Sequence, residues 1–198
     1  MSGKYLSVCS AFFIVTACVA SRLDPMSVPL VYKPNLKNSG LLGGLECHAI
    51  SGVQVSDGRT EKTLGVRAHE SKPLKADVTL AGDPTVWVQD GMQGFLAQNG
   101  VNVQGTGPKL LVSLDSLHTV ESVLRRASYE ARVGLSAELQ SATGRSCWKQ
   151  PVEGTAGNYG YAGTVLNYQE TTNAALDAAS VHLTEAQGFK TALCHCAE

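Results

Sequence analysis

The sequence predicts an α+β fold: an antiparallel sheet of about four strands with two helices on one face, in the order β-α-β-β-β-α. Residues 127–140 alternate strictly between apolar and polar side chains, which is typical of a long strand with one buried and one solvent-facing side. Apolar residues recur at helical spacing in 83–100 and again from about residue 172. Because the strands are grouped along the chain, we expect them to pair antiparallel.

The first strand is expected at residues 49–55, where apolar and polar side chains alternate ahead of the turn-rich run 56–60. Residues 64–66 and 74–80 contain shorter apolar patterns that predict further extended pieces.

The first helix is expected to begin at Asp83 and Pro84. An Asp side chain accepts hydrogen bonds from the free amides of a first turn, and Pro suits the first helical position. Asn99 and Gly100 are the expected stop, because Gly adopts the left-handed conformation at low cost.

The second half of the chain predicts two strands, a hairpin and a helix. Alternation over 110–117 predicts one strand, and 127–140 turns at 142–145 into a hairpin partner at 146–150. The Gly- and Tyr-rich run 154–163 is expected to be a loop.

The last helix is expected to be capped by Thr171 or Thr172, with an end or kink at Gly188.

The N-terminal segment predicts export from the cytosol. Lys4 precedes an apolar run from Tyr5 to Ala17, which is shorter than the roughly 20 residues that a spanning helix needs. The run ends in small residues directly before Cys18, which resembles the lipobox of bacterial lipoproteins. The resemblance implies a signal peptide at 1–17, a diacylglyceryl group on the Cys18 sulfur and an acylated amine. The alternatives are an ordinary signal peptide with an incidental cysteine, or a cytosolic protein with an apolar N-terminus.

Residues 18–44 predict a flexible tether from Cys18, because prolines and glycines are scattered through this segment. The alternative for Val28 to Tyr32 is an edge strand of the domain. Residues 45–198 are expected to form a single α+β domain.

The remaining cysteines predict disulfides. Cys47, Cys147, Cys194 and Cys196 are an even set in an oxidising compartment and allow three pairings. A Cys194–Cys196 bridge would be strained, so we expect at least one long-range link to Cys47 or Cys147. A zinc site made by Cys47-His48 together with Cys194-His195-Cys196 is the alternative, but neither spacing matches a common zinc motif, and no metal or cofactor is predicted.

The element order and several segments resemble the YajG-like family of bacterial lipoproteins. The points of similarity are the lipobox at Cys18, the run 53–60 leading to Leu64-Gly65, the helix ending in 95–100 and the long strand after 110–114. The resemblance covers most of residues 45–193 and implies no catalytic residues.

Five further residues are candidates for partner binding. Asp57 and Arg59 are expected mainly to act locally, the first in an Asx turn and the second by pairing with a carboxylate or carbonyl group at the sheet edge. Tyr159, Tyr161 and Tyr168 could form a binding loop, since amphipathic aromatic side chains suit interfaces, or could cover the end of the core.

The predicted function is that of a non-catalytic accessory or scaffold in an envelope assembly, on the periplasmic face of the outer membrane. Residue 19 is Val and not Asp, which by the lipoprotein resemblance implies the outer membrane. The sheet edge, its solvent-facing side or the Tyr-rich loop would hold another envelope protein. No Gly-x-Ser-x-Gly or phosphate-binding motif is present, and a net charge of −1 gives no reason to expect nucleic acid. The alternative is a small-ligand-binding or hydrolytic protein that acts on cell-wall or lipid material.

Overall fold

The computed structural model describes residues 23–34, 37, 39–43, 45, 47, 49–123 and 126–196. The predicted signal peptide at 1–17 and the lipidation site Cys18 lie outside these residues. The helices and strands are β1 (Met26–Val28), β2 (Gly52–Asp57), β3 (Gly65–His69), β4 (Lys75–Leu80), α1 (Pro84–Gln98), β5 (Lys109–Val123), β6 (Ala127–Gln140), β7 (Ser146–Gly160), α2 (Val165–Glu185) and α3 (Phe189–His195). None of the described helices is long and apolar enough to cross a membrane.

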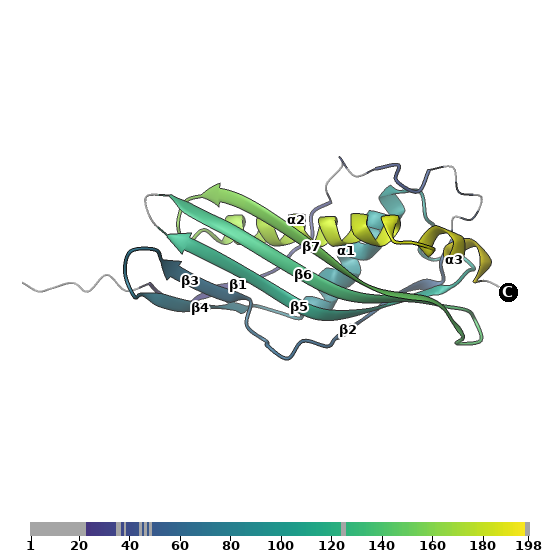
Figure 1. Cartoon of the computed structure of the whole chain (residues 1–198), viewed down its shortest axis with the longest axis horizontal. Coiled ribbons are helices and arrows are strands. Elements are labelled where there is room, and N and C mark those ends of the chain that lie inside the picture. Colours follow the sequence, from purple (N-terminus) through teal and green to yellow (C-terminus); the bar gives the residue numbers. More distant parts are fainter. Residues whose placement is uncertain are drawn as a thin grey trace, which may run out of the picture.

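The strands form one mixed seven-stranded sheet in the order β1-β4-β3-β5-β6-β7, and β2 pairs with β5 outside this path (Figure 1). Strand β5 is central: β6 runs antiparallel along one edge, while β2 and β3 run parallel to successive halves of the other edge. The chain leaves that edge after Asp57 and returns at Gly65, so two short strands share one long partner.

The prediction of about four antiparallel strands is therefore wrong in detail, although the α+β class is confirmed. The pairs β1–β4, β2–β5 and β3–β5 are parallel. Between β3 and β5, the strand β4 and the helix α1 carry the chain back to its starting end, so β5 runs in the same direction as β3. Local alternation predicts where strands lie but carries no information on such a crossover.

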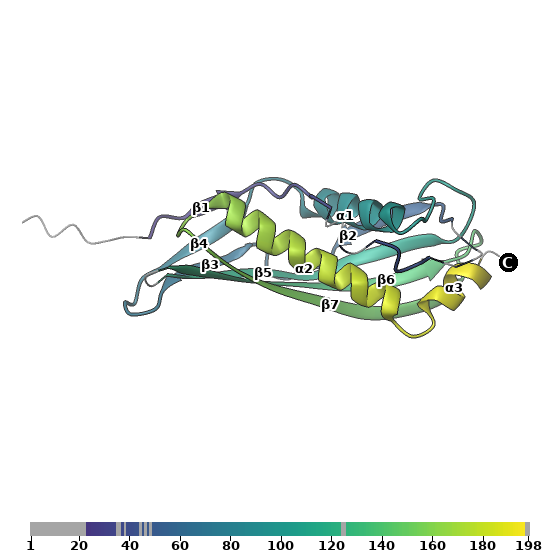
Figure 2. The same cartoon turned by 90° about the horizontal axis from the view of Figure 1, so that it is seen from above.

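Helices α1 and α2 cover one face of the sheet (Figure 2). A third helix, α3, follows α2, so the prediction of two helices is wrong in detail. No helix among the described residues covers the other face. The inward side of β6 supplies much of the core, with Tyr129, Val133, Leu135, Ala137 and Leu139 all buried. The alternation over 127–140 is confirmed, and its polar side forms part of the helix-free face.

The ends of α1 are those that the sequence predicts. The Asp83 side chain accepts a hydrogen bond from the Thr85 amide at 2.8 Å, and Pro84 is the first helical residue. Asn99 caps the other end, and Gly100 follows with a left-handed φ of 87°.

The loop expected at 154–163 is in large part strand β7, which continues to Gly160. The glycine at 154 serves packing and not flexibility, because helix α2 crosses β7 at this point. A Cβ atom on Gly154 would lie 2.1 Å from the Ala175 carbonyl oxygen and 2.2 Å from the Ala179 nitrogen.

Helix α2 begins at Val165 and not near residue 172 as predicted. The hydroxyl groups of Thr171 and Thr172 donate to the carbonyl groups of Asn167 and Tyr168, one turn earlier, at 2.7 and 2.6 Å. These threonines are thus bonded within the helix and do not cap it. Gly188 separates α2 from α3, as expected.

Residues 26–32 belong to the folded domain, so the tether predicted for 18–44 is wrong for this part and the alternative of an edge strand describes it better. Strand β1 pairs with β4 at the sheet edge. Three residues spaced by one helical turn on α2 bind the segment that follows: Gln169 Nε2 donates to the Pro29 carbonyl at 2.6 Å, Asn173 Nδ2 donates to the Val31 carbonyl at 3.0 Å, and Asp177 Oδ1 accepts from the Tyr32 hydroxyl at 2.7 Å.

Candidate functional site

The four cysteines of the domain form two disulfides, Cys47–Cys194 and Cys147–Cys196. Their Cα–Cα distances of 5.1 and 5.6 Å lie in the normal range for disulfides. Both bridges join the C-terminal helix region to distant parts of the chain, which agrees with the expected long-range link. The thiols that a zinc site would need are therefore used in the disulfides.

Asp57 and Arg59 bind each other. Arg59 Nε and Nη2 donate to the two carboxylate oxygens of Asp57 at 2.9 and 3.0 Å, and the Arg59 amide donates to Oδ1 at 3.1 Å. The Lys62 ammonium lies 3.0 Å from Oδ2. The hydrogen bonds from Arg59 hold the pKa of the Asp57 carboxyl well below its usual range, so Asp57 stays ionised and is poorly suited to act as a general base.

The three candidate tyrosines do not form one cluster. Tyr168 lies on α2 and is fully buried, whereas Tyr159 and Tyr161 are 77% and 87% exposed. Burial, followed by the charge of Glu121, raises the pKa of the Tyr168 hydroxyl. Only Tyr159 and Tyr161 of this group remain accessible to a partner.

A buried polar cluster centred on Glu121 lies beneath the loop that carries Tyr161. Arg67 Nε donates to one carboxylate oxygen of Glu121 at 2.6 Å, and the Gly163 amide donates to the other at 2.5 Å. The hydroxyls of Tyr168 and Tyr129 also donate to Glu121, at 2.9 and 3.1 Å. Both carboxylate oxygens of Glu121 are hydrogen-bonded inside the protein, so this cluster has a structural role.

Sequence reasoning missed this cluster, although a signal was present. Leu117, Thr119 and Glu121 occupy alternate, inward positions of β5. A glutamate at the third of these positions must be paired, because burying an unpaired charge is costly.

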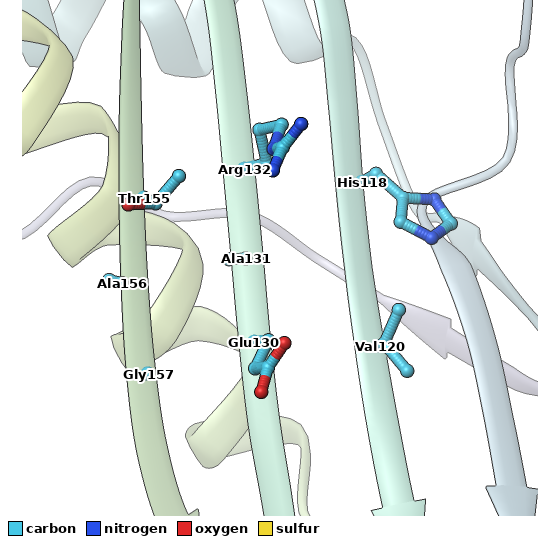
Figure 3. Close-up of a pocket in the computed structure, with 8 residues that line it drawn as sticks. All are labelled: His118, Val120, Glu130, Ala131, Arg132, Thr155, Ala156 and Gly157. Atoms are coloured by element: carbon cyan, nitrogen blue, oxygen red, sulfur yellow. The ribbon is translucent and has the colours of Figure 1, made fainter.

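The helix-free face of the sheet carries a broad, shallow hollow of about 810 Å³ over β5, β6 and β7. His118, Glu130 and Arg132 project from neighbouring strands around it, and Val120, Thr155 and Gly157 complete its lining (Figure 3). Arg132 Nε lies 3.4 Å from Glu153 Oε1, with both side chains more than half exposed. The hollow therefore presents charges of both signs.

The hollow does not have the form of a small-molecule site. Such sites are concave and mostly apolar, and they enclose most of the ligand's surface. Here the floor is one layer of strand side chains that face solvent. In the part of the chain that the structure describes, no group of three or more His, Cys, Asp or Glu side chains could hold a metal ion.

No protein-family model matches the sequence, and no curated protein matches it. Solved structures show similarity in shape. A Xanthomonas campestris protein of the DUF330 family has a TM-score of 0.47 at 12% identity, covering 80% of this chain and 91% of its own. A candidate lipoprotein from Caulobacter crescentus has a TM-score of 0.42 at 17% identity, with coverages of 58% and 86%. A minor lipoprotein from Acinetobacter baumannii has a TM-score of 0.37 at 10% identity, with coverages of 70% and 94%.

Two of these three proteins are described as lipoproteins, the class that the sequence predicts here. At this level of similarity they assign neither a family nor a role to the chain. The resemblance to the YajG-like family stays a prediction.

Proposed function

We propose that this chain is a lipid-anchored envelope protein that acts as a non-catalytic scaffold, with a partner protein bound on the helix-free face of its sheet. The observation that supports the binding role most directly is the hollow over β5, β6 and β7. The outer membrane is the proposed location, because Val19 follows the predicted lipidated cysteine.

The chemistry of the hollow favours a protein as its occupant. Glu130, Arg132 and Glu153 place opposite charges side by side, and Val120 adds apolar surface next to Glu130 on the neighbouring strand β5. Protein interfaces combine apolar contacts with complementary charges in this way. Nucleic acid would require a largely positive surface.

The disulfides are consistent with a location outside the cytosol. Disulfides form and persist mainly in oxidising compartments, and this chain has two.

The alternative of a hydrolytic or ligand-binding protein needs a cleft that combines Asp57, Arg59 and a histidine. Asp57 and Arg59 are instead bound to each other, which lends that alternative no support.

Photo-crosslinking in intact cells tests the scaffold role. A photoreactive amino acid at Thr155 in the hollow is compared with the same group at Ala174, an exposed position on α2. We expect one discrete crosslinked species from Thr155, none from Ala174, and loss of that species when Arg132→Glu is added. Equal crosslinking from both positions, or none from Thr155, would contradict a partner on this face.

The anchor is tested separately by mass spectrometry of the mature N-terminus and by fractionation. We expect an acylated Cys18 in the membrane fraction, and release of a Cys18→Ser variant from that fraction. An unprocessed N-terminus on protein from the cytosol would overturn the anchor.

A further inference from the structure

We propose that Tyr159 and Tyr161 form a membrane-contact patch that rests on the lipid leaflet and sets the orientation of the domain. This inference rests on the proposed lipid anchor, and it adds a second, weaker contact with the same membrane. The partner is a phospholipid surface, and the argument depends on the exposure of these tyrosines and on their distance from the anchor.

Tyr159 and Tyr161 are the most exposed large hydrophobic side chains in the described part of the chain, at 77% and 87%. Leu166, which comes shortly after these tyrosines in the sequence and lies on the first turn of α2, is 46% exposed. Arg126 and the two tyrosines line a shared hollow of about 500 Å³ at this end of the sheet. Tyrosine is enriched where membranes meet water, because its ring is apolar and its hydroxyl group is polar.

The loop that carries Tyr161 is held rigidly. The Tyr161 carbonyl accepts hydrogen bonds from the Tyr129 hydroxyl at 2.6 Å, the Thr164 hydroxyl at 2.9 Å and Asn167 Nδ2 at 3.1 Å. The backbone that carries the exposed ring is thus ordered by hydrogen bonds, while the ring itself is not packed. An ordered backbone reduces the conformational entropy that the segment loses when it contacts a surface.

The predicted anchor lies close to this loop. Arg67 Nη1 donates to the Asp24 carbonyl at 2.9 Å, and a Cβ atom on Gly163 would lie 2.7 Å from Nη2 of the same guanidinium group. Asp24 and Gly163 therefore contact one side chain. Cys18 precedes Asp24 by six residues, so even a fully extended chain places the lipid within about 20 Å of this point.

Both views of the molecule place β1 and the end of β7 at one end of the long axis, with α3 at the other (Figures 1 and 2). The turn after β3 also lies at the anchored end, because the Glu70 amide donates to the Val123 carbonyl at the end of β5. Arg126 is an exposed cation in the hollow that the tyrosines line. Lys72 is exposed in the turn after β3, at the same end of the molecule, and the Glu70 carboxylate accepts a hydrogen bond from Ser122. Exposed cations favour anionic headgroups.

Acylated full-length protein in vesicles of phosphatidylethanolamine and phosphatidylglycerol tests the patch. Tyr161→Trp introduces a reporter whose emission is compared with and without lipids brominated near the headgroup. Val86→Trp is the matched control, since Val86 is 56% exposed on α1, away from this end. We expect about a twofold loss of the added emission for Tyr161→Trp and little loss for Val86→Trp.

A second reporter separates contact by the tyrosines from mere closeness of the tether. We expect the brominated lipids to quench the emission of Ala162→Trp in the otherwise unchanged protein. We expect this quenching to be lost when Tyr159→Ser and Tyr161→Ser are added. Unchanged quenching in that background, or equal quenching of the Val86→Trp control, overturns the proposal. Failure of the anchor is seen independently, because protein without the lipid does not float with the vesicles.

Discussion

Glu121 shows how one buried charge organises the end of the molecule opposite to α3. Its carboxylate is fully buried and accepts from Arg67, Tyr129, Tyr168 and the Gly163 amide. These donors come from β3, β6, α2 and the loop before α2, so a single side chain connects four separate segments.

We expect Glu121→Gln to destabilise the protein by about 3–5 kcal/mol, because it removes the charge that compensates buried Arg67. Urea unfolding measures this loss. Glu130→Gln on the exposed face of β6 is the matched control and should change stability by no more than about 0.5 kcal/mol. A loss at Glu121 as small as that of the control would mean that the ion pair contributes nothing to stability.

For Asp177 we expect the opposite effect: removal of its charge should stabilise the protein. Burial raises the pKa of its carboxyl, while the hydrogen bond from Tyr32 lowers it by a smaller amount. A raised pKa in the folded state means that stability increases as the pH falls through that pKa toward the unfolded value of about 3.9.

Asp177→Asn keeps an oxygen that can accept from Tyr32 but removes the charge. We therefore expect the variant to be more stable than the parent at pH 7, with a difference that disappears by about pH 4. Urea unfolding as a function of pH measures this, with Asp90→Asn on exposed α1 surface as control. A variant that is less stable than the parent at pH 7 would contradict the prediction.

At the scale of the elements, the close approach of α2 to β7 depends on one missing side chain. Gly154 sits directly beneath the backbone of α2, at distances that no Cβ atom can occupy. Gly157, three residues later on the same strand, has only an ordinary contact at 3.7 Å.

We expect Gly154→Ala to destabilise the protein by about 2 kcal/mol or more, since the backbone of α2 or β7 must shift. Gly157→Ala should be neutral or slightly stabilising, because Gly weakens a strand interior. Thermal unfolding of the two variants side by side gives the comparison. Similar effects at both positions would show that α2 does not approach β7 as closely as described.

Gly154 also illustrates which elements could be predicted from the sequence and which could not. Helix α1 and strand β6 follow from local signals: a capping Asp, a Pro and strict alternation. Gly154 looks locally like a loop residue, and its true role depends on a helix that arrives later in the chain. The parallel pairing of β2 and β3 with β5 is likewise set by the crossover through α1 and not by either strand.

The candidate site could also be predicted only where its residues are close together in the sequence. Local chemistry predicted an Asx turn at Asp57 and a polar partner for Arg59, and the structure shows that each is the partner of the other. The hollow over β5, β6 and β7 joins residues from three strands. The sequence predicted that polar side chains face outward, but not that these residues lie next to one another.

At the scale of the whole molecule, the two disulfides connect the end that carries α3 to distant parts of the chain. Cys47–Cys194 spans 147 residues and Cys147–Cys196 spans 49. On the chain-entropy account, longer closed loops give greater stabilisation.

We expect the loss of Cys47–Cys194, by Ala substitution of both residues, to cost up to about 5 kcal/mol. Loss of Cys147–Cys196 by the same means should cost up to about 4 kcal/mol. Urea unfolding under non-reducing conditions compares the two double variants. If removal of Cys147–Cys196 lowers the free energy of unfolding clearly more than removal of Cys47–Cys194, then loop length does not govern how much each disulfide stabilises the protein.

Strand β1 begins at the end of the molecule opposite to α3 and runs parallel to β4 toward the interior of the molecule. With the proposed lipid anchor ahead of β1, a mechanical pull from the membrane would act along the strand axis, in shear, and would load the β1–β4 bonds together and not one after another. Gln169 and Asn173 on α2 would share that load through the carbonyl groups of Pro29 and Val31. Such an arrangement would keep the domain folded under tension on the anchor.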